Sequence, residues 1–570
     1  MAYKYHVGVV DYAAIVLTLL ISAGIGIKFR YFGKKQNTMK DYFMAGKNMS
    51  KFPVIISICV TMTSAVSMLG TPSEIYRYGV QSIVINLGLP IGIALAAYVF
   101  IPVYFQCGVS TVYEFLEIRY GKITRYVVSA LFILQMVLYM SSVLYAPVLA
   151  LNAVTDLSIE LSIIVFGAIC TFYCAMGGLK AVLWSDVFQF NLMFITIMAL
   201  YIAGIREAGG LAQVYDTANS GSRLNMFDFR VDLTTRYTFL NCLLQGIMYG
   251  FGCYGTSQIE VQRLLSLSNV KRAKSTLLIS ILPVTGLYLL CNLYGLILYS
   301  VYYLCDPISN KKVTGLTKYD QLVPYFLVSK FHSIPGLTGL CMAGIFSGSL
   351  STVSSALNSL ATVTVVDFIH PLFSSIRSNE AKSVFIAKTL SFCYGFICIC
   401  LAFALLHTSS IKQVSNLVNS TVDGPVAAIF TLGILTTKCS GKNVLFGLLA
   451  GVAVTSWIGY GTLFSGYIQA SLPMNTSKCA TSFNFTETVS YTIPTYLGFE
   501  NISSSTSSML VSQSDIFILY KVSYYWIRPI GFITTIFFTF LAVCLTGWKA
   551  KISLVGGKNK TNCKDIIEIS

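Results

Sequence analysis

Residues 347–364 read S-G-S-L-S-T-V-S-S-A-L-N-S-L-A-T-V-T. Nine of these eighteen side chains carry a hydroxyl group, although the segment is otherwise apolar enough to lie in a lipid bilayer. At helical spacing, one face collects Gly348, Ser351, Thr352, Ser355 and Ser359. A neutral stripe of oxygen atoms inside a membrane can replace the hydration shell of Na⁺. The alternative is that small hydroxyl residues only let helices approach closely and hydrogen-bond to each other.

The composition of the whole chain is that of a polytopic membrane protein. Of its 570 residues, 55% are apolar and 11% are charged, and the mean hydropathy is +0.70. A spanning helix needs about 20 apolar residues. Segments of this kind are centred near residues 18, 63, 95, 137, 167, 195, 247, 290, 349, 396, 425, 453 and 537. The sequence therefore predicts an all-α membrane protein with about 13 spanning helices and no separate soluble domain.

The net charge of +16 is unevenly distributed along the chain. With an extracellular N-terminus and an odd number of spans, the densest basic clusters, at residues 28–51 and 549–564, lie on the cytoplasmic side. This bias orients membrane helices and meets anionic lipid. It predicts a multi-pass membrane protein with a cytoplasmic tail at residues 548–570, a lipid bilayer as its surroundings, and no nucleic acid as a partner. We expect the membrane to be the plasma membrane.

A long polar loop at residues 464–525 carries three Asn-X-Ser/Thr sequons, at Asn475, Asn484 and Asn501. The predicted topology places this loop outside the cell, where these asparagines can be glycosylated. Most of the sixteen cysteines fall in apolar spans. Cys305 and Cys479 fall in predicted outer loops, which makes them a candidate disulfide.

The sequence lacks the motifs of common enzyme classes. None of its four histidines has metal-ligand spacing, and no G-x-x-x-x-G-K-S/T loop is present to hold phosphates. We therefore predict that the protein is not an enzyme and uses no cofactor. If it moves a solute uphill, an ion gradient supplies the energy.

Two spans contain signals that interrupt a helix. Residues 54–74 have small polar residues in the middle, followed by Gly70 and Pro72, where the helix is either broken or simply ends. Residues 245–258 carry three glycines. Interrupted spans five helices apart indicate two inverted repeats around a site at the membrane midplane.

We expect one transporter domain over residues 1–570. Its divisions are repeat one at about 53–206, repeat two at about 239–437, and flanking helices at about 9–28, 444–463 and 527–547.

Six blocks of sequence, taken in order, resemble the sodium/solute symporter family over nearly the whole chain. They are D-Y-F-M-A-G-K at 41–47, G-T-P-S-E-I-Y-R-Y-G at 70–79, V-Y-E-F-L-E-I-R-Y-G at 112–121, G-G-L-K-A-V-L-W-S-D-V-F-Q at 177–189, Q-I-E-V-Q-R at 258–263 and S-G-S-L-S-T-V-S-S at 347–355. The second block is most similar to the branch of monocarboxylate and multivitamin transporters. The resemblance implies a five-plus-five inverted-repeat core, a broken first helix in each repeat, and alternating access. It also implies Na⁺-coupled import of a small organic anion.

The resemblance also implies sodium ligands. The main site would use the backbone carbonyls of Val60, Thr63 and Gly348 and the hydroxyls of Ser351 and Thr352. A candidate second sodium site would lie near Asp186, Ser354 and Ser355. The alternative for Asp186 is a helix-end cap or a salt bridge with Lys180.

The substrate would lie near Ser64, Ser67, Tyr145, Tyr249 and Tyr254. Hydroxyl groups can donate to a carboxylate while aromatic rings pack against its apolar part. Each tyrosine alone is equally explained by packing or by anchoring at the membrane interface.

Asp423 departs from the family pattern, which has glycine at this position. An acid within the membrane is costly and indicates a function. It could hold a further cation, take a proton, or disfavour anionic substrates; alternatively, it faces a water-filled vestibule and does little.

Two other functions are compatible with the same sequence. One is transport of iodide or another inorganic anion, and the other is a sensor or channel that does not concentrate a solute.

Overall fold

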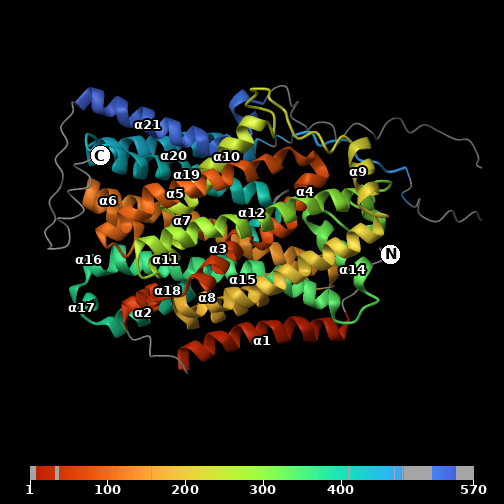
Figure 1. The fold of residues 1–570 in the computed structure, drawn as a ribbon, viewed down its shortest axis with the longest axis horizontal. Helices are drawn as coiled ribbons and strands as arrows, with labels where there is room; N and C mark the ends of the chain where they lie inside the picture. Colours follow the sequence, from red (N-terminus) through yellow and green to blue (C-terminus); the bar gives the residue numbers. More distant parts are fainter. Residues whose placement is uncertain are drawn as a thin grey trace, which may run out of the picture.

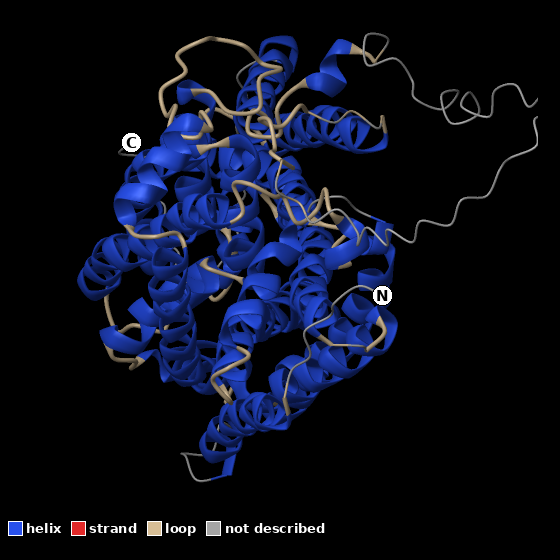
Figure 2. Ribbon diagram, turned by 90° about the vertical axis from the view of Figure 1, so that its right-hand side faces the viewer, coloured by secondary structure: helices blue, strands red, loops and turns tan. Residues whose placement is uncertain are grey.

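The computed structural model describes residues 8–31, 38–155, 157–407, 411–465, 467, 469–477, 479 and 516–546. These residues form helices and connecting loops, and they contain no strand (Figure 2). The long helices run roughly along one common direction, which is horizontal in Figure 1. Asn475 lies in the described part of the outer loop, whereas Asn484, Asn501 and the tail at 548–570 lie outside the described residues.

The helices, in chain order, are α1 (Val9–Tyr31), α2 (Met39–Met44), α3 (Lys51–Met62), α4 (Ala65–Tyr78), α5 (Ile85–Cys107), α6 (Val112–Tyr120), α7 (Lys122–Val154), α8 (Ile159–Glu207), α9 (Leu211–Ser220), α10 (Phe239–Thr256), α11 (Gln258–Leu265), α12 (Val270–Val301), α13 (Lys311–Thr314), α14 (Leu322–Phe331), α15 (Leu337–Val363), α16 (His370–Leu372), α17 (Ser374–Arg377), α18 (Glu380–Ala402), α19 (Ile411–Leu435), α20 (Gly441–Phe464) and α21 (Ile527–Thr546).

The hydroxyl-rich segment forms most of α15, which lies at the centre of the bundle. Nearly every residue of α15 is buried, polar positions included. The helix packs against α8, α7, α1 and α18 on several sides and against α3 and α4 on another. A helix that is buried all round must satisfy its polar groups within the protein. The hydroxyl groups of α15 are therefore available to neighbouring helices or to a bound ion, and not to lipid.

The break in the first core helix lies before the position that Gly70 and Pro72 indicate. Helix α3 ends at Met62, α4 begins at Ala65, and the two are bent by 49°. Helix α4 then continues through Gly70 and Pro72 to Tyr78. Gly70 serves packing, because a β-carbon there would lie 2.9 Å from Cβ of Lys412 in α19.

The three glycines of the second interrupted span do not break it either. Helix α10 is continuous from Phe239 to Thr256, and the interruption falls at Ser257, where the backbone is extended before α11. The reason is helix packing: a β-carbon on Gly250 would lie 2.9 Å from the backbone nitrogen of Ile93 in α5. Small residues let two membrane helices approach this closely. Helices α5 and α10 accordingly make the most extensive contact between two helices in the bundle.

The span count can be compared with the prediction only in part. Within the described residues, ten helices are long and apolar enough to cross a membrane, or up to eleven when the bent pair α3 and α4 counts as one span. The predicted span near residue 167 falls on the shorter segment Ile159–Phe172 of α8, before the kink at Gly178. The predicted span near residue 247 falls on α10, an 18-residue helix that is not among these ten. The all-α membrane fold is confirmed, while the count of thirteen and the inverted repeat stay predictions.

Candidate functional site

The break between α3 and α4 exposes backbone groups in the middle of the bundle. Thr63 and Ser64 have non-helical backbone angles (φ −100°, ψ 67° and φ −68°, ψ 170°). The carboxyl end of α3 and the amino end of α4 therefore meet here, with unpaired carbonyls on one side and unpaired N–H groups on the other. A helix carboxyl end favours cations, and a helix amino end favours anions.

Helix α15 lies directly against this break. A β-carbon on Gly348 would lie 2.9 Å from the backbone nitrogen of Ala65 and 3.3 Å from the carbonyl oxygen of Thr63. Thr352 Oγ1 donates to the carbonyl of Gly348 (3.0 Å) and lies 3.4 Å from the carbonyl oxygen of Thr61. The structure thus brings Gly348 and Thr352, two of the predicted sodium ligands of α15, to the break.

Several of these oxygen atoms have capacity for a ligand. Ser351 Oγ and Thr63 Oγ1 are buried and have no hydrogen-bond partner within the part of the chain that the structure describes. The carbonyl of Val60 accepts one hydrogen bond, from the backbone N–H of Thr63 (3.2 Å). Carbonyl and hydroxyl oxygens at an unwound helix are the donor set that sodium-coupled transporters use. The neutral oxygen atoms fit Na⁺.

The candidate second sodium set is partly engaged by protein groups, although Asp186 Oδ1 is buried and has no hydrogen-bond partner among the described residues. Asp186 lies inside α8, not at a helix end, and its Oδ2 accepts from Ser57 Oγ (2.5 Å). Ser355 Oγ accepts from the guanidinium of Arg263 (2.6 Å), which comes from α11. Ser354 Oγ donates to the carbonyl of Ser351 (3.0 Å). The buried guanidinium of Arg263 therefore lies against Ser355, at the position where this residue would contact a second Na⁺.

A small enclosed space of about 40 Å³, here called the central cavity, lies beside the break. Room for a water molecule takes roughly 10–15 Å³, so the cavity holds only a few waters. Its lining includes the predicted substrate residues Ser64, Ser67 and Tyr249. The lining residues are Met62, Ser64, Val66, Ser67, Thr71, Ile85, Tyr139, Gln245, Tyr249, Tyr288, Lys412, Ser415, Asn416 and Asn419.

Tyr145 and Tyr254, the other two predicted substrate tyrosines, are not among the residues that line the central cavity. Successive residues turn by about 100° around a helix, so Tyr254 points roughly 140° away from Tyr249. The Tyr145 hydroxyl instead accepts a hydrogen bond from Lys318 Nζ (3.0 Å).

Asp423 forms an ion pair that was not apparent from the sequence. Its Oδ2 accepts from the guanidinium of Arg528 in α21 (2.8 Å), and its Oδ1 accepts from Gln135 Nε2 (2.6 Å). The Arg528 guanidinium is buried and also lies 5.0 Å from the ring centroid of Tyr249. Because the acid is neutralised by Arg528, it does not present a free negative charge to the central cavity.

We expect Asp423→Asn to lower the stability of the protein strongly. The substitution leaves the Arg528 guanidinium buried without its counter-ion, which costs roughly 3 kcal/mol or more. The thermal unfolding midpoint in detergent should fall for the single variant and recover in Asp423→Asn with Arg528→Gln. The double variant should also keep the substrate charge preference of the unmodified protein. A changed preference in the double variant would show that Asp423 acts on the substrate directly.

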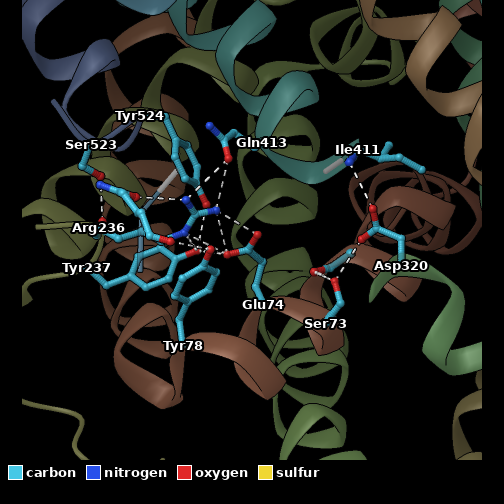
Figure 3. Close-up of polar contacts among 12 residues, drawn as sticks. Ser73, Glu74, Tyr78, Arg236, Tyr237, Asp320, Ile411, Gln413, Ser523 and Tyr524 are labelled. Carbon is cyan, nitrogen blue, oxygen red and sulfur yellow. Dashed lines mark hydrogen bonds and ion pairs between the residues drawn. The ribbon is translucent and has the colours of Figure 1, made fainter. Parts of the chain in front are cut away.

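A second buried ion pair lies near the central cavity, about one turn along α4 from the lining residue Thr71. Arg236 Nη2 donates to both carboxylate oxygens of Glu74 (2.9 and 3.0 Å), and the Tyr237 hydroxyl donates to the same carboxylate (2.5 Å) (Figure 3). Tyr237 in turn hydrogen-bonds to Tyr524 (2.8 Å), and the carbonyl of Arg236 accepts from Ser523 (2.6 Å). The cluster joins α4, the loop before α10 and the segment before α21, on the side predicted to be extracellular.

The predicted outer cysteines are joined in the structure. Cys305 and Cys479 form a disulfide that connects segments 174 residues apart. Next to it, the backbone N–H of Asp306 donates to the carbonyl of Asn475 (3.0 Å), so the first predicted sequon is held against the end of α12.

Comparison with known proteins agrees with this arrangement. The model of the sodium:solute symporter family matches residues 42–451. A putative sodium-dependent multivitamin transporter of Drosophila melanogaster is 36% identical over 534 residues, which cover 93% of this chain and 85% of the fly protein. The sodium-coupled monocarboxylate transporter 1 of Homo sapiens is 35% identical over 542 residues, which cover 94% of this chain and 87% of the human protein.

One solved structure shares the fold. A Na⁺-coupled sialic acid symporter in a substrate-bound, outward-open state superposes with a TM-score of 0.75, at 21% identity, over 95% of this chain and 100% of the other.

Proposed function

This chain belongs to the sodium:solute symporter family, and from that premise we propose that it imports a small organic anion together with Na⁺ across the plasma membrane. The anion is a monocarboxylate or a vitamin-like acid, the two classes named in its relatives. Transport proceeds by alternating access, with the extracellular N-terminus and cytoplasmic C-terminus that the charge distribution predicts.

The observation that carries this proposal is the meeting of the broken helix with α15. The Thr63 carbonyl lies against Gly348 of α15 at the carboxyl end of α3, where Na⁺ is favoured. The hydroxyl of Ser351, one turn further along α15, is buried and has no hydrogen-bond partner among the described residues. The amino end of α4, with Ser64 and Ser67, faces the central cavity on the other side. A single break therefore serves both the cation and the solute, so binding of one preorganises the site for the other. Such coupling must be reciprocal.

The amino end of α4 favours a solute with a negative charge. The positive end of a broken helix commonly points at the carboxylate of a transporter substrate. Met62, Val66 and Ile85 provide apolar contacts for the remainder of a small acid. If two Na⁺ accompany one monoanion, each cycle moves one positive charge inward, and the membrane potential contributes about 2.3 kcal/mol per 100 mV.

Uptake in expressing cells tests the proposal. Labelled lactate, butyrate, nicotinate, biotin, pantothenate, iodide and glucose are compared in Na⁺ and in choline medium. We expect concentrative uptake of at least one organic acid that is confined to Na⁺ medium. Uptake of iodide alone would show that the substrate is an inorganic anion and not an organic acid. Na⁺ currents without accumulation of any solute would instead identify a channel or sensor.

A further inference from the structure

Lys412 brings a buried positive charge to the central cavity. It is the second residue of α19, its side chain is 4% exposed, and it lines the cavity. Its Nζ has no hydrogen-bond partner among the described residues. An ammonium group has three donors, and burying it without partners is strongly unfavourable. A group that completes these hydrogen bonds is therefore expected at this position.

The two carboxylates near Lys412, those of Glu74 and Asp320, accept hydrogen bonds from other groups. Glu74 is held by Arg236 and Tyr237. Asp320 accepts from Ser73 Oγ (2.9 Å) and from the backbone N–H of Ile411 (3.1 Å), on the right of Figure 3. Both carboxylates lower the electrostatic cost of the Lys412 charge without accepting its hydrogen bonds.

The two chain neighbours of Lys412 fix its position. Ile411 is tied to Asp320 through its backbone N–H, and Gln413 Oε1 lies 3.5 Å from the Arg236 guanidinium (Figure 3). The first turn of α19 is therefore anchored on both sides of Lys412. This leaves the lysine side chain between the anchors, at the wall of the central cavity.

Two further polar atoms of the cavity wall have no hydrogen-bond partner in the described part of the chain. They are the buried atoms Ser415 Oγ, one turn along α19 from Lys412, and Gln245 Oε1 in α10. Residues three apart lie on the same helix face. An ammonium and a hydroxyl group on one face offer a carboxylate a donor for each of its oxygens.

We propose that Lys412, with Ser415 beside it, binds the carboxylate of the transported anion. This inference rests on the proposed function and narrows it, because it makes a carboxylate, and not merely a small solute, the feature that the site selects. The carboxylate lies between α19 and the amino end of α4. The rest of the anion lies toward Met62, Val66 and Ile85. Hydroxyl groups of Ser64 and Ser67 complete the contacts from α4.

Comparison of an acid with its neutral amide tests the proposal. The readout is the concentration of butyrate, or of butyramide, that halves uptake of a labelled carboxylate in Na⁺ medium. In the unmodified protein, butyrate should be more effective than butyramide by roughly 10- to 100-fold, the range of charge-assisted hydrogen bonds. Lys412→Gln should lose most of this difference, and Lys412→Arg should keep most of it. Lys442→Gln, at an exposed lysine of α20, is the matched control and should change nothing.

The outcomes separate this inference from the proposed function. If the unmodified protein takes up no carboxylate in Na⁺ medium, the proposed function fails. If it does, and Lys412→Gln keeps the preference for butyrate over butyramide, only the role of Lys412 is overturned. Should Lys412→Gln not reach the cell surface, Ser415→Ala decides. This variant should raise the concentration of butyrate that halves uptake several-fold relative to that of butyramide. An equal effect on both compounds would contradict the proposal.

Discussion

Replacement of Ser351 and Thr352 by alanine together is expected to abolish Na⁺-dependent uptake while the protein still reaches the cell surface. The double variant removes the hydroxyl of Thr352, which lies 3.4 Å from the carbonyl oxygen of Thr61, and that of Ser351, which is buried without a hydrogen-bond partner among the described residues. Contacts to a charged group contribute about 1.5–3 kcal/mol each. Loss of two such contacts should therefore raise the half-saturating Na⁺ concentration by at least roughly 100-fold.

The measurement is uptake as a function of Na⁺ concentration, normalised to protein labelled at the surface. Ser349→Ala is the matched control, because Ser349 lies on the same helix but donates to the carbonyl of Val143 in α7 (2.7 Å). It should leave the Na⁺ dependence as it is. A double variant with an unaltered half-saturating concentration would place the sodium site elsewhere in the bundle.

The sequence predicts the central helix well because its signal is local. Helical periodicity alone gathers Ser351 and Thr352 on one face of α15, and the structure directs that face at the broken helix. The position of the break in the first core helix is harder to predict from the sequence, since it depends on contacts with neighbouring helices. Gly70 is the stronger local signal, yet it is used for contact with α19, and the chain opens at Thr63 and Ser64 instead.

The charged groups of the site show more clearly what cannot be predicted from the sequence alone. Arg236, Lys412 and Arg528 read as ordinary basic residues near the ends of apolar segments. Their roles depend on partners more than a hundred residues away in the chain, such as Glu74 for Arg236 and Asp423 for Arg528. No pattern within a single segment reports such a pairing. An acid in the membrane could be recognised as unusual, but whether it is neutralised required the fold.

The ion pair between Glu74 and Arg236 yields the other large expected effect. Glu74→Gln should open the central cavity to reagents added from outside and reduce uptake. The Arg236 guanidinium would remain buried with a neutral partner, and breaking a buried pair in this way costs about 3–5 kcal/mol. Since the pair joins α4 to the loop before α10, the lost free energy should destabilise mainly the form of the protein in which the central cavity is closed to the outside. A change of this size shifts the ratio of closed to open forms by roughly 100-fold or more.

Labelling of a cysteine in the cavity wall measures this shift. Asn416→Cys provides the target, and its reaction with a membrane-impermeant thiol reagent should be at least tenfold faster in the presence of Glu74→Gln. Arg230→Gln is the matched control, because Arg230 lies six residues from Arg236 but pairs with Asp228 at the surface, where such a bond contributes at most about 1 kcal/mol. An unchanged labelling rate with Glu74→Gln, in protein that reaches the surface, would mean that contacts other than this pair close the cavity. Faster labelling in both variants would point to loosening of the whole loop before α10, since Arg230 and Asp228 both lie within that loop.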